Sequence, residues 1–483
     1  MKILKQIGLA TAIATAGVSA TALATDDGSG SVATPIDFGA WIQVQLRLLS
    51  LPLFGVLQPV GASSTASIDA ATANANPAAL VTVAKGLRAK TVTAAANAGP
   101  NIDMMAPWPD ALNPTHLIAC NEEGPAQPGV QRIRLSDGLV ETILTGTNSC
   151  DPVRATAWGT IIVGEESGST GQVLEIAKPL ETTGVIFDRV TGTTTNGPGG
   201  TGAENVVTRW ALGRLSFEGM ALYSSGVMYY GDEKRPSQGT PGGAYFKFVP
   251  TYPWTGGTPI TDLSVSPLTD GKVYALRLGK RSGNTDWGQG SNTGLGVWVP
   301  ITPSFNVDLS DTSAALKITG YYRPEDIDID RVAEASGLVR FCGNNTGNEV
   351  DDQNFGETVC LSDGTLAESL ANTATPSLQL FVVGTPDFAM MDNIAYQPGR
   401  RNWVINEDGD GPAVGRNNDI FDCLPDRADD DRLSDGCVKV VTLNDLNAES
   451  TGGTFDATGK RYWVSIQHNV TGHGVVLEIT GWK

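Results

Sequence analysis

Short apolar and β-branched runs, separated by glycine turns, recur along most of the chain. A glycine followed by a short strand rich in aromatic or β-branched residues appears at Gly159, Gly226, Gly271, Gly337, Gly399 and Gly459. Successive glycines are 67, 45, 66, 62 and 60 residues apart, so each interval has room for a four-stranded sheet with loop insertions. We therefore expect six similar sheets, and the blades of an all-β, six-bladed β-propeller fit these lengths better than solenoid repeats.

An acidic residue opens a second short apolar strand before three of these turns. These strands begin at Glu218, Glu325 and Asp392. The inner strands of a propeller run along a central channel, so equivalent positions of successive blades converge at one end of it. Carboxylates gathered there repel one another, and a bound cation relieves the repulsion. A single acid of this kind more often caps a turn, but three in register predict a site for hard cations such as calcium.

The composition agrees with many short strands. The chain has 57 Gly and 27 Pro in 483 residues, a mixture typical of strands joined by tight turns. The formal net charge of −19 argues against nucleic acid or an anionic membrane surface as a partner. We expect a monomer.

The first 24 residues have the pattern of a secretory signal peptide. Lys2 and Lys5 precede a small-residue apolar stretch at 7–20, and Ala22-Leu23-Ala24 matches a cleavage site. No pair of arginines precedes the apolar stretch, which favours general secretion over the twin-arginine route. We therefore expect an exported protein in the periplasm, at the cell surface or outside the cell.

The sequence suggests three segments: the signal peptide 1–24, an N-terminal extension 25–105 and a propeller domain 106–483. The extension is rich in Ala, Thr, Asn and Ser, and its composition leaves open a packed helix, a pedestal or a partly ordered arm. Within it, residues 38–57 are apolar but interrupted by polar residues and Pro52. Their alternation favours a strand or a packed amphipathic segment over a membrane span, so we do not expect an integral membrane protein.

Six cysteines in an oxidising compartment predict disulfide bonds. Cys342 and Cys360, and likewise Cys423 and Cys437, are close enough in sequence to form local staples. Cys120 and Cys150 remain. An even cysteine count permits their pairing, and the alternative is that they stay free.

Several motifs resemble those of one known family. The segment Cys150-Asp-Pro-Val-Arg-Ala-Thr-Ala-Trp158-Gly-Thr-Ile-Ile-Val-Gly-Glu165-Glu166 resembles the Cys…TPWGT…EE signature of the PhoX-type bacterial alkaline phosphatases. Segments that resemble the family's GRF…HE, RPE, DN and closing-strand motifs follow in the family's order, at 212–218, 322–326, 392–393 and 463–468. The resemblance runs from about Pro107 to the end of the chain.

This resemblance implies a six-bladed propeller that hydrolyses phosphomonoesters with calcium and a pair of iron ions. It assigns Glu218 and Glu325 as metal ligands, Cys150 as an iron ligand, and Arg323 as the cation that binds phosphate. Arginine suits that role because its planar fork can hold two phosphate oxygens. Trp158 would contact the phosphate or form a wall of the pocket. Further calcium candidates are Glu165, Glu166, Asp232, Glu233 and Asp392. A disulfide between Cys120 and Cys150 would consume the thiolate that iron needs.

Other features have a structural interpretation beside the functional one. The acid-rich segment 406–410 lacks the spacing of an EF-hand, so we interpret it as a solvated loop. Arg154 is either a second phosphate contact or a surface residue. His116, His468 and His473 are too few and too scattered for an obvious zinc site.

Two hypotheses from different classes remain. The first is an extracytoplasmic metal-dependent phosphatase acting on a small-molecule phosphoester. The second is a catalytically silent, calcium-stabilised propeller that acts as a surface binding or structural protein. The presence of Arg323, Glu218, Glu325 and Cys150 favours the first.

Overall fold

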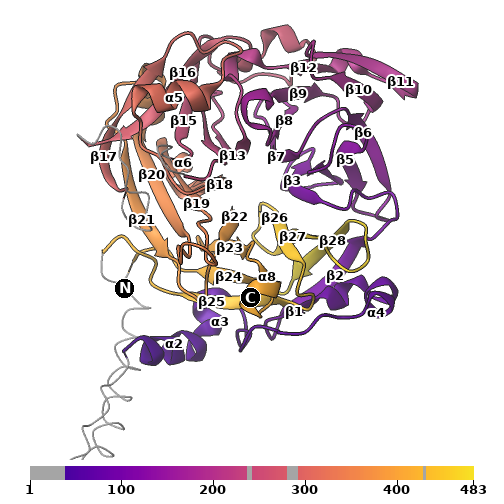
Figure 1. The fold of residues 1–483 in the computed structure, drawn as a ribbon, viewed down its shortest axis with the longest axis vertical. Coiled ribbons are helices and arrows are strands. Elements are labelled where there is room, and N and C mark those ends of the chain that lie inside the picture. The colour runs from indigo at the N-terminus through magenta and orange to yellow at the C-terminus, as the bar shows by residue number, and fades with distance from the viewer. Residues whose placement is uncertain (1–37, 237–241, 280–291, 428–430) are drawn as a thin grey trace, which may run out of the picture.

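The computed structural model describes residues 38–236, 242–279, 292–427 and 431–483, without the side chains of residues 38–42. Its elements are mainly β-strands, arranged around a central channel (Figure 1). The predicted all-β propeller is confirmed. The predicted signal peptide at 1–24 lies outside the described residues.

Six inner strands form a closed ring around the channel. They are β3 (Ile102–Trp108), β7 (Cys150–Ala155), β13 (Phe217–Leu222), β18 (Pro324–Ile329), β22 (Met391–Tyr396) and β26 (Glu449–Phe455). Each strand contacts the next in this order, and β26 contacts β3. Positions that are equivalent along these strands therefore face one another across the channel (Figure 1).

The described residues form five hydrogen-bonded sheets around this ring. Two have four strands: β7 with β8 (Thr160–Glu165), β9 (Val173–Ala177) and β12 (Val206–Thr208), and β26 with β27 (Arg461–Gln467), β28 (Val475–Thr480) and β2 (Arg88–Thr93). The sheet of β3 adds β4 (His116–Asn121), β5 (Pro128–Arg134), β6 (Val140–Thr145), β10 (Thr183–Asp188) and β11 (Thr193–Thr201). The sheet of β22 adds β23 (Trp403–Glu407), β24 (Asp419–Cys423), β25 (Cys437–Leu443) and β1 (Val81–Val83).

The fifth sheet has nine strands and contains two inner strands, β13 and β18. From β13 it runs through β14 (Met228–Asp232), β15 (Tyr245–Pro250), β16 (Gly271–Leu278) and β17 (Gly294–Ile301). From β18 it runs through β19 (Leu338–Asn345), β20 (Glu357–Thr365) and β21 (Ser377–Val383). A short pairing of Gly294 with Leu378 and of Leu295 with Ser377 joins β17 to β21. Six inner strands thus belong to five sheets.

Five of the six glycines that predicted the repeat occupy one equivalent place. Gly159, Gly226, Gly337, Gly399 and Gly459 lie in the turn between an inner strand and its neighbour, all with positive φ, a conformation that favours glycine. Gly271 does not: it begins β16, in the same sheet as Gly226. The turn of the first blade, between β3 and β4, contains no glycine. The sequence analysis therefore counted six turns because it included Gly271 wrongly and missed the turn of the first blade, and the two errors cancel.

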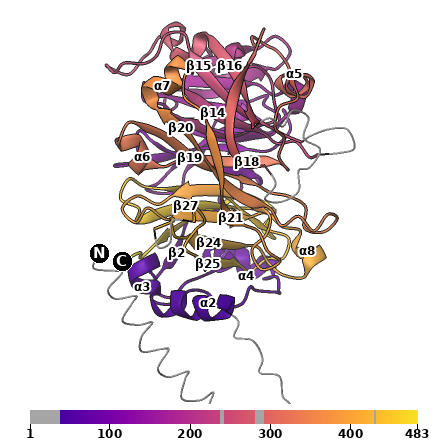
Figure 2. The same cartoon turned by 90° about the vertical axis from the view of Figure 1, so that its left-hand side faces the viewer.

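The N-terminal extension is part of the propeller. Strand β2 pairs with β28 in the sheet of β26, and strand β1 pairs with β25 in the sheet of β22, so the N-terminal segment supplies the outer strands of the last two sheets. The predicted boundary at residue 106 falls inside β3. Residues 38–57, expected as a strand or a packed amphipathic segment, form helices α2 (Phe38–Leu48) and α3 (Ser50–Phe54) beside β25 (Figure 2).

The remaining helices are short. They are α4 (Ala70–Ala75), α5 (Leu309–Leu316), α6 (Arg331–Ala335), α7 (Leu366–Ala371) and α8 (Gly411–Val414). No helix among the described residues is long and apolar enough to cross a membrane.

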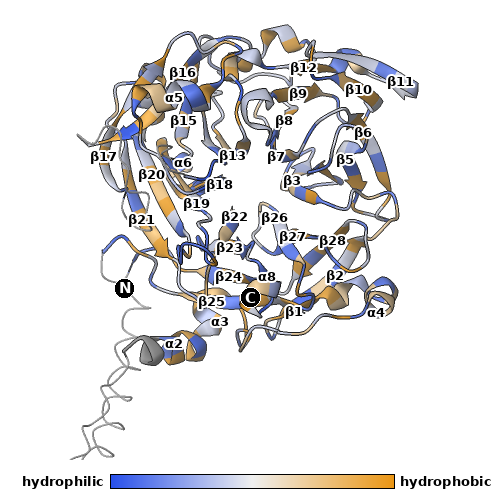
Figure 3. Cartoon of the chain, viewed as in Figure 1, coloured by the Kyte–Doolittle hydropathy of each residue, from blue (hydrophilic) through white to orange (hydrophobic). Residues whose placement is uncertain are grey.

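Hydrophobic residues are spread over every sheet (Figure 3), because the core consists of the interfaces between neighbouring sheets. One of these interfaces holds the N-terminal segment. Phe54, Leu80 and Leu87 are buried there together with Leu477 and Ile479 of β28. The predicted staples are confirmed: Cys342 bonds Cys360 between β19 and β20, and Cys423 bonds Cys437 between β24 and β25.

We predict that closure of the ring depends on β2. A chain that begins at residue 95 lacks β1 and β2, which exposes the backbone of β28 and the side chains of Leu477 and Ile479. Burial of each such side chain contributes about 1.5–3 kcal/mol, so the truncated chain should lose its cooperative thermal transition, measured by circular dichroism. A chain that begins at residue 38 is the control and should unfold cooperatively. Equal melting temperatures for the two chains would contradict the prediction.

Candidate metal centre

Five inner strands carry an acid at their second residue. These acids are Asp103, Asp151, Glu218, Glu325 and Asp392. In each blade the register between the inner strand and its neighbour shifts at this point, as between Phe217 and Met220. Such an irregularity changes the direction of a side chain. In β26 the shift lies at Gly452 and Gly453, and the acid of this strand is its first residue, Glu449.

A second set of acids follows the neighbouring strands. Glu122, Glu166, Glu233 and Asp408 come directly after β4, β8, β14 and β23. The equivalent residues of the other two blades are Thr346 and His468. We refer to the two sets together as the carboxylate cluster, whose members are Asp103, Glu122, Asp151, Glu166, Glu218, Glu233, Glu325, Asp392, Asp408 and Glu449. Asp103, Asp151, Glu218 and Glu325 are buried, whereas the others are partly exposed.

Oxygen atoms of the cluster approach one another closely enough to share a cation. In the group of Asp103, Glu122 and Asp151, one oxygen of each residue lies within 4.8 Å of the others, and the same holds for Asp151, Glu166 and Glu218. Asp151 belongs to both groups. Its Oδ1 is buried and has no hydrogen-bond partner among the described residues. Buried polar atoms normally have a partner, so this oxygen fits the role of a metal ligand.

Arg323 lies among the acids, directly before β18. Its Nε bonds Glu233 and is 3.2 Å from Oε1 of Glu325, and its Nη2 is 3.9 Å from Oδ2 of Asp408. Burial opposes its charge, but these three carboxylates raise the pKa of Arg323 above the usual value of arginine. Its backbone φ is +55°, an uncommon conformation for a residue other than glycine.

The crowding of the acids changes their protonation. Burial is the largest cause that raises the pKa values of Asp103, Asp151, Glu218, Glu325, Asp392 and Glu449. Burial and the neighbouring carboxylates of Glu122 and Glu233 raise the pKa of Glu166 to about 12. Without a cation, the cluster therefore retains protons at neutral pH.

Two of the predicted calcium ligands do not join the cluster. Successive residues of a strand point to opposite faces, so Glu165 and Asp232 turn away from Glu166 and Glu233. Glu165 is buried and bonds Arg189 at 2.7 Å. Asp232 is also buried, and its burial raises its pKa to about 7. Both predictions are therefore corrected, whereas Glu166, Glu218, Glu233, Glu325, Asp392 and Arg323 do lie together.

Trp158 is part of the hydrophobic core and does not line the cluster. It lies in the turn between β7 and β8, whereas Cys150 and Glu165 pair at the opposite end of the same hairpin. Its side chain is fully buried, and Nε1 donates to Oε1 of Glu175 at 2.7 Å. Oε2 of Glu175 accepts from Arg209. The predicted phosphate contact of Trp158 is therefore wrong, because its ring anchors a buried ion pair.

Cys150 is bonded to Cys120, which resolves the alternative that the sequence left open. The disulfide joins β7 to β4 of the neighbouring blade and leaves no thiolate for a metal. The prediction of Cys150 as an iron ligand is corrected accordingly. The residue after Cys150 in the same motif, Asp151, is the one that enters the cluster.

Sequence reasoning missed Asp103, Asp151, Glu122, Asp408 and Glu449. Asp408 lies in the segment 406–410, which we interpreted as a solvated loop. Its neighbour Glu407, the last residue of β23, is buried and bonds Arg416 at 2.7 Å, so the segment is not a solvated loop at this point. An alignment of the inner-strand sequences of all blades, with the acids in one column, would have identified Asp103 and Asp151.

Comparison with known proteins places this geometry in context. The model of the family "Alkaline phosphatase PhoX" matches residues 115–469. Pseudomonas fluorescens PhoX, solved in complex with vanadate, a transition-state analogue, is similar with 16% identity and a TM-score of 0.60, over 87% of this chain and 98% of that one. The chain has no match among curated proteins.

Two further similar structures are more distant. A Xanthomonas campestris gluconolactonase has 13% identity and a TM-score of 0.41, over 88% of this chain and 99% of its own. A PQQ-bound aldose sugar dehydrogenase of Streptomyces coelicolor has 11% identity and a TM-score of 0.39, over 83% and 99%.

The raised pKa values predict how stability depends on pH. The folded, metal-free protein holds a proton on Glu166 that the unfolded chain releases above the ordinary pKa of 4.5. The folded state then binds more protons, so the free energy of unfolding falls as pH rises from about 5 towards 9. Calcium should abolish this trend, because its binding releases the protons and the folded and unfolded states then bind equal numbers of them. Melting temperatures measured with EDTA and with calcium test this, and a metal-free melting temperature that rises over this range would contradict it.

The position of Trp158 predicts a structural effect of its substitution. Trp158→Phe removes the donor to Glu175 and should lower the free energy of unfolding by about 1–3 kcal/mol. Calcium affinity should not change, because Trp158 lies at the far end of the hairpin. Urea unfolding and calcium titration measure the two quantities. Loss of calcium affinity at unchanged stability would contradict this prediction and support a role of Trp158 at the metal site.

Proposed function

This chain belongs to the PhoX alkaline phosphatase family, and we propose that it is an exported, metal-dependent phosphatase that hydrolyses phosphomonoesters at the carboxylate cluster. The observation that carries the proposal is a set of carboxylate oxygens close enough to share a cation, with an arginine among them. Asp151 offers a buried oxygen without a hydrogen-bond partner among the described residues, and Arg323 lies beside Glu233 and Glu325. A phosphate ester needs both kinds of partner.

The donor set fits hard cations. Every group of the carboxylate cluster offers oxygen, which calcium prefers. Bound calcium would contribute electrostatic stabilisation of phosphate oxygens and of charge on the leaving group. With Cys150 in a disulfide, an iron ion here would depend on oxygen ligands alone. Calcium is therefore the cofactor we propose, and iron is a further candidate that the family resemblance supplies.

Arg323 is placed to hold the phosphate. In the described part of the chain its side chain donates hydrogen bonds through Nε alone. The distance of 3.9 Å from Nη2 to Asp408 is longer than a hydrogen bond. The outer edge of the guanidinium group is therefore available for two phosphate oxygens, and Glu233 and Glu325 fix its orientation from the other side.

The three disulfides support the proposed export. They join strands within blades and between blades, and such bonds persist in oxidising compartments. Periplasm, cell surface and medium all satisfy this condition.

We predict calcium-dependent hydrolysis of p-nitrophenyl phosphate at alkaline pH by the protein without residues 1–24. Arg323→Ala should lower kcat/KM by about 100-fold or more, because a charged donor to the transferring group is lost. Arg340→Ala is the matched control, since Arg340 of β19 pairs at 3.0 Å with Asp330, the N-cap residue of α6, and is not part of the cluster. Its activity should equal that of the unchanged protein.

The outcomes separate the two hypotheses. Turnover that requires calcium and Arg323 supports the phosphatase. Calcium binding without any turnover favours the catalytically silent, calcium-stabilised binding propeller. A folded protein that neither binds calcium nor hydrolyses the ester would refute the proposed site.

A further inference from the structure

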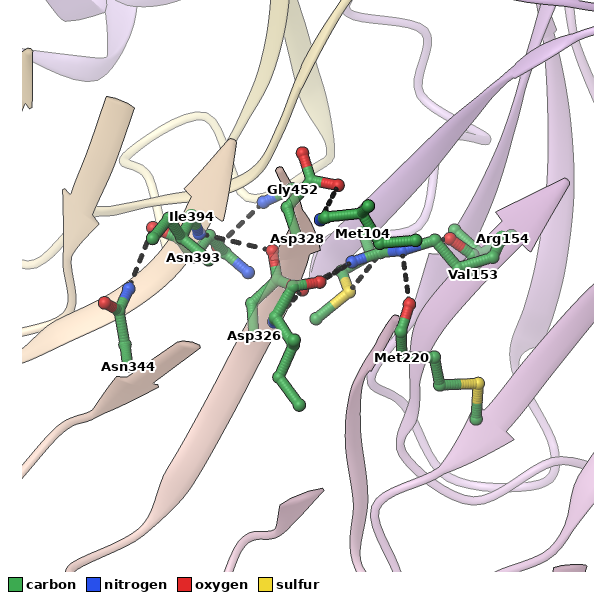
Figure 4. Close-up of polar contacts among 12 residues, drawn as sticks. Met104, Val153, Arg154, Met220, Asp326, Asp328, Asn344, Asn393, Ile394 and Gly452 are labelled. Carbon is green, nitrogen blue, oxygen red and sulfur yellow. Dashed lines mark hydrogen bonds and ion pairs between the residues drawn. The ribbon is translucent and has the colours of Figure 1, made fainter. Parts of the chain in front are cut away.

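A set of partly buried polar contacts joins inner strands of the ring to one another (Figure 4). Arg154 of β7 bonds Asp326 of β18 at 2.6 Å, although β13 lies between these two strands in the ring. Nε of Arg154 donates to the carbonyl of Met220 in β13 at 3.0 Å, and Nη2 donates to the carbonyl of Ile327 at 2.9 Å. One side chain thus ties three consecutive inner strands together.

The same contacts continue around the ring. Oδ2 of Asp326 accepts from the backbone N–H of Ile394 in β22 at 3.2 Å. The side chain of Asn393, also in β22, accepts from the N–H of Gly452 in β26 at 2.8 Å and donates to Asp103 in β3 at 3.3 Å. Nη1 of Arg154 lies 3.4 Å from the sulfur of Met104 in β3. This contact joins β3 to β7, the strand from which the series of contacts began. We call Arg154, Asp326 and Asn393 the channel belt.

Two of the three belt residues directly follow cluster residues, and Arg154 lies three residues after Asp151. Asp326 follows Glu325, Asn393 follows Asp392, and Asn393 bonds a cluster carboxylate, Asp103, directly. Asp326 and Asn393 lie where their inner strands depart from regular pairing with their neighbours, as between Pro324 and Ile327, whereas Arg154 pairs regularly with Ile162 just after such a shift. Backbone pairing does not fix the strands there, so the belt supplies the fixed geometry.

Arg154 has no donor left for a substrate. Its guanidinium group is saturated by the acceptors Met220 O, Val153 O, Met104 Sδ, Asp326 Oδ1 and Ile327 O. The earlier alternatives, a phosphate contact or a surface residue, are both replaced by an internal ion pair. Arg154 and Asp326 also line a cavity of about 440 Å³ in the channel, which no cluster residue lines. The belt therefore separates the cluster from this cavity.

We propose that Arg154 and Asp326, together with Asn393, are positioning residues that set the spacing of the metal-binding carboxylates. This inference rests on the proposed metal-dependent function. The cluster carboxylates repel one another, and the repulsion would spread the inner strands apart in the absence of a cation. The belt holds β7, β13, β18, β22, β26 and β3 at one separation, so the cation site is preformed.

The test compares the loss of this ion pair with the loss of a similar one elsewhere. Arg154→Met removes the positive charge of the belt and keeps an unbranched side chain in its place. Arg209→Met is the matched control, because Arg209 bonds Glu175 at 2.6 Å, is likewise largely buried, and is not part of the cluster or the belt. Calcium affinity is measured by titration calorimetry, and the calcium concentration for half-maximal hydrolysis of p-nitrophenyl phosphate is measured beside the melting temperature with EDTA.

Arg154→Met should weaken calcium binding by roughly tenfold or more, as substitution of groups that orient metal ligands does, and should raise the half-maximal calcium concentration equally. Arg209→Met should lower the melting temperature at least as much, with unchanged calcium affinity. The double variant Arg154→Met/Asp326→Leu leaves no unpaired charge and should fold if the single variant does not. It should still bind calcium more weakly than the unchanged protein.

Wild-type calcium affinity in the foldable belt variant would overturn the positioning role while leaving the proposed function intact. Absence of calcium binding in the unchanged protein would instead refute the proposed function, and this inference with it. The two failures are distinguishable in one set of titrations.

Discussion

Mutual repulsion of buried carboxylates is the constraint on which the centre of this structure depends. Two unit charges about 4 Å apart repel by about 4 kcal/mol at an effective dielectric constant near 20, and three cluster oxygens within 4.8 Å of one another occur twice, with Asp151 in both groups. Protons, Arg323 and a bound cation are the available ways to reduce that energy. The raised pKa of Glu166 shows the first of them, and the ion pairs of Arg323 show the second.

Holding these acids together requires inner strands at fixed separations, and three kinds of contact in the chain contribute to that. The pairing of β2 with β28 ties the N-terminal segment to the last sheet. The belt of Arg154, Asp326 and Asn393 connects the inner strands. The disulfide of Cys120 and Cys150 is directly beside the cluster, because Asp151 follows one cysteine and Glu122 lies two residues after the other. It binds two neighbouring blades together at the point where their acids meet, and a metal–thiolate bond is not required for that.

The sequence was informative where a feature repeats and uninformative where it does not. Recurrent glycine turns and acids predicted the propeller and the positions of Glu218, Glu325 and Asp392. Asp103 was missed because the sequence analysis placed residues 25–105 outside the propeller, and the pairing of strands far apart in the chain is needed to show that β3 is an inner strand. Trp158 failed for another reason. A motif gives the order of residues along a hairpin, but the two ends of the hairpin pair with each other while its turn lies at the opposite end of the strands, and order alone does not show at which of these two places the cluster forms.

The sixth blade shows why the repeat is imperfect at the site itself. Its inner strand has Gly452 where the other five have an acid. A Cβ at Gly452 would lie 2.0 Å from the carbonyl oxygen of Asp103, and φ there is +64°. An aspartate or glutamate is therefore excluded by the close approach of β26 to β3, the place where the last blade meets the first. The acid of this blade lies three residues earlier, at Glu449, and its partner at 3.0 Å is His468. The close approach of β26 to β3 thus accounts for the absence of an acid at Gly452, and the cluster is asymmetric because the acid of this blade lies at Glu449 instead.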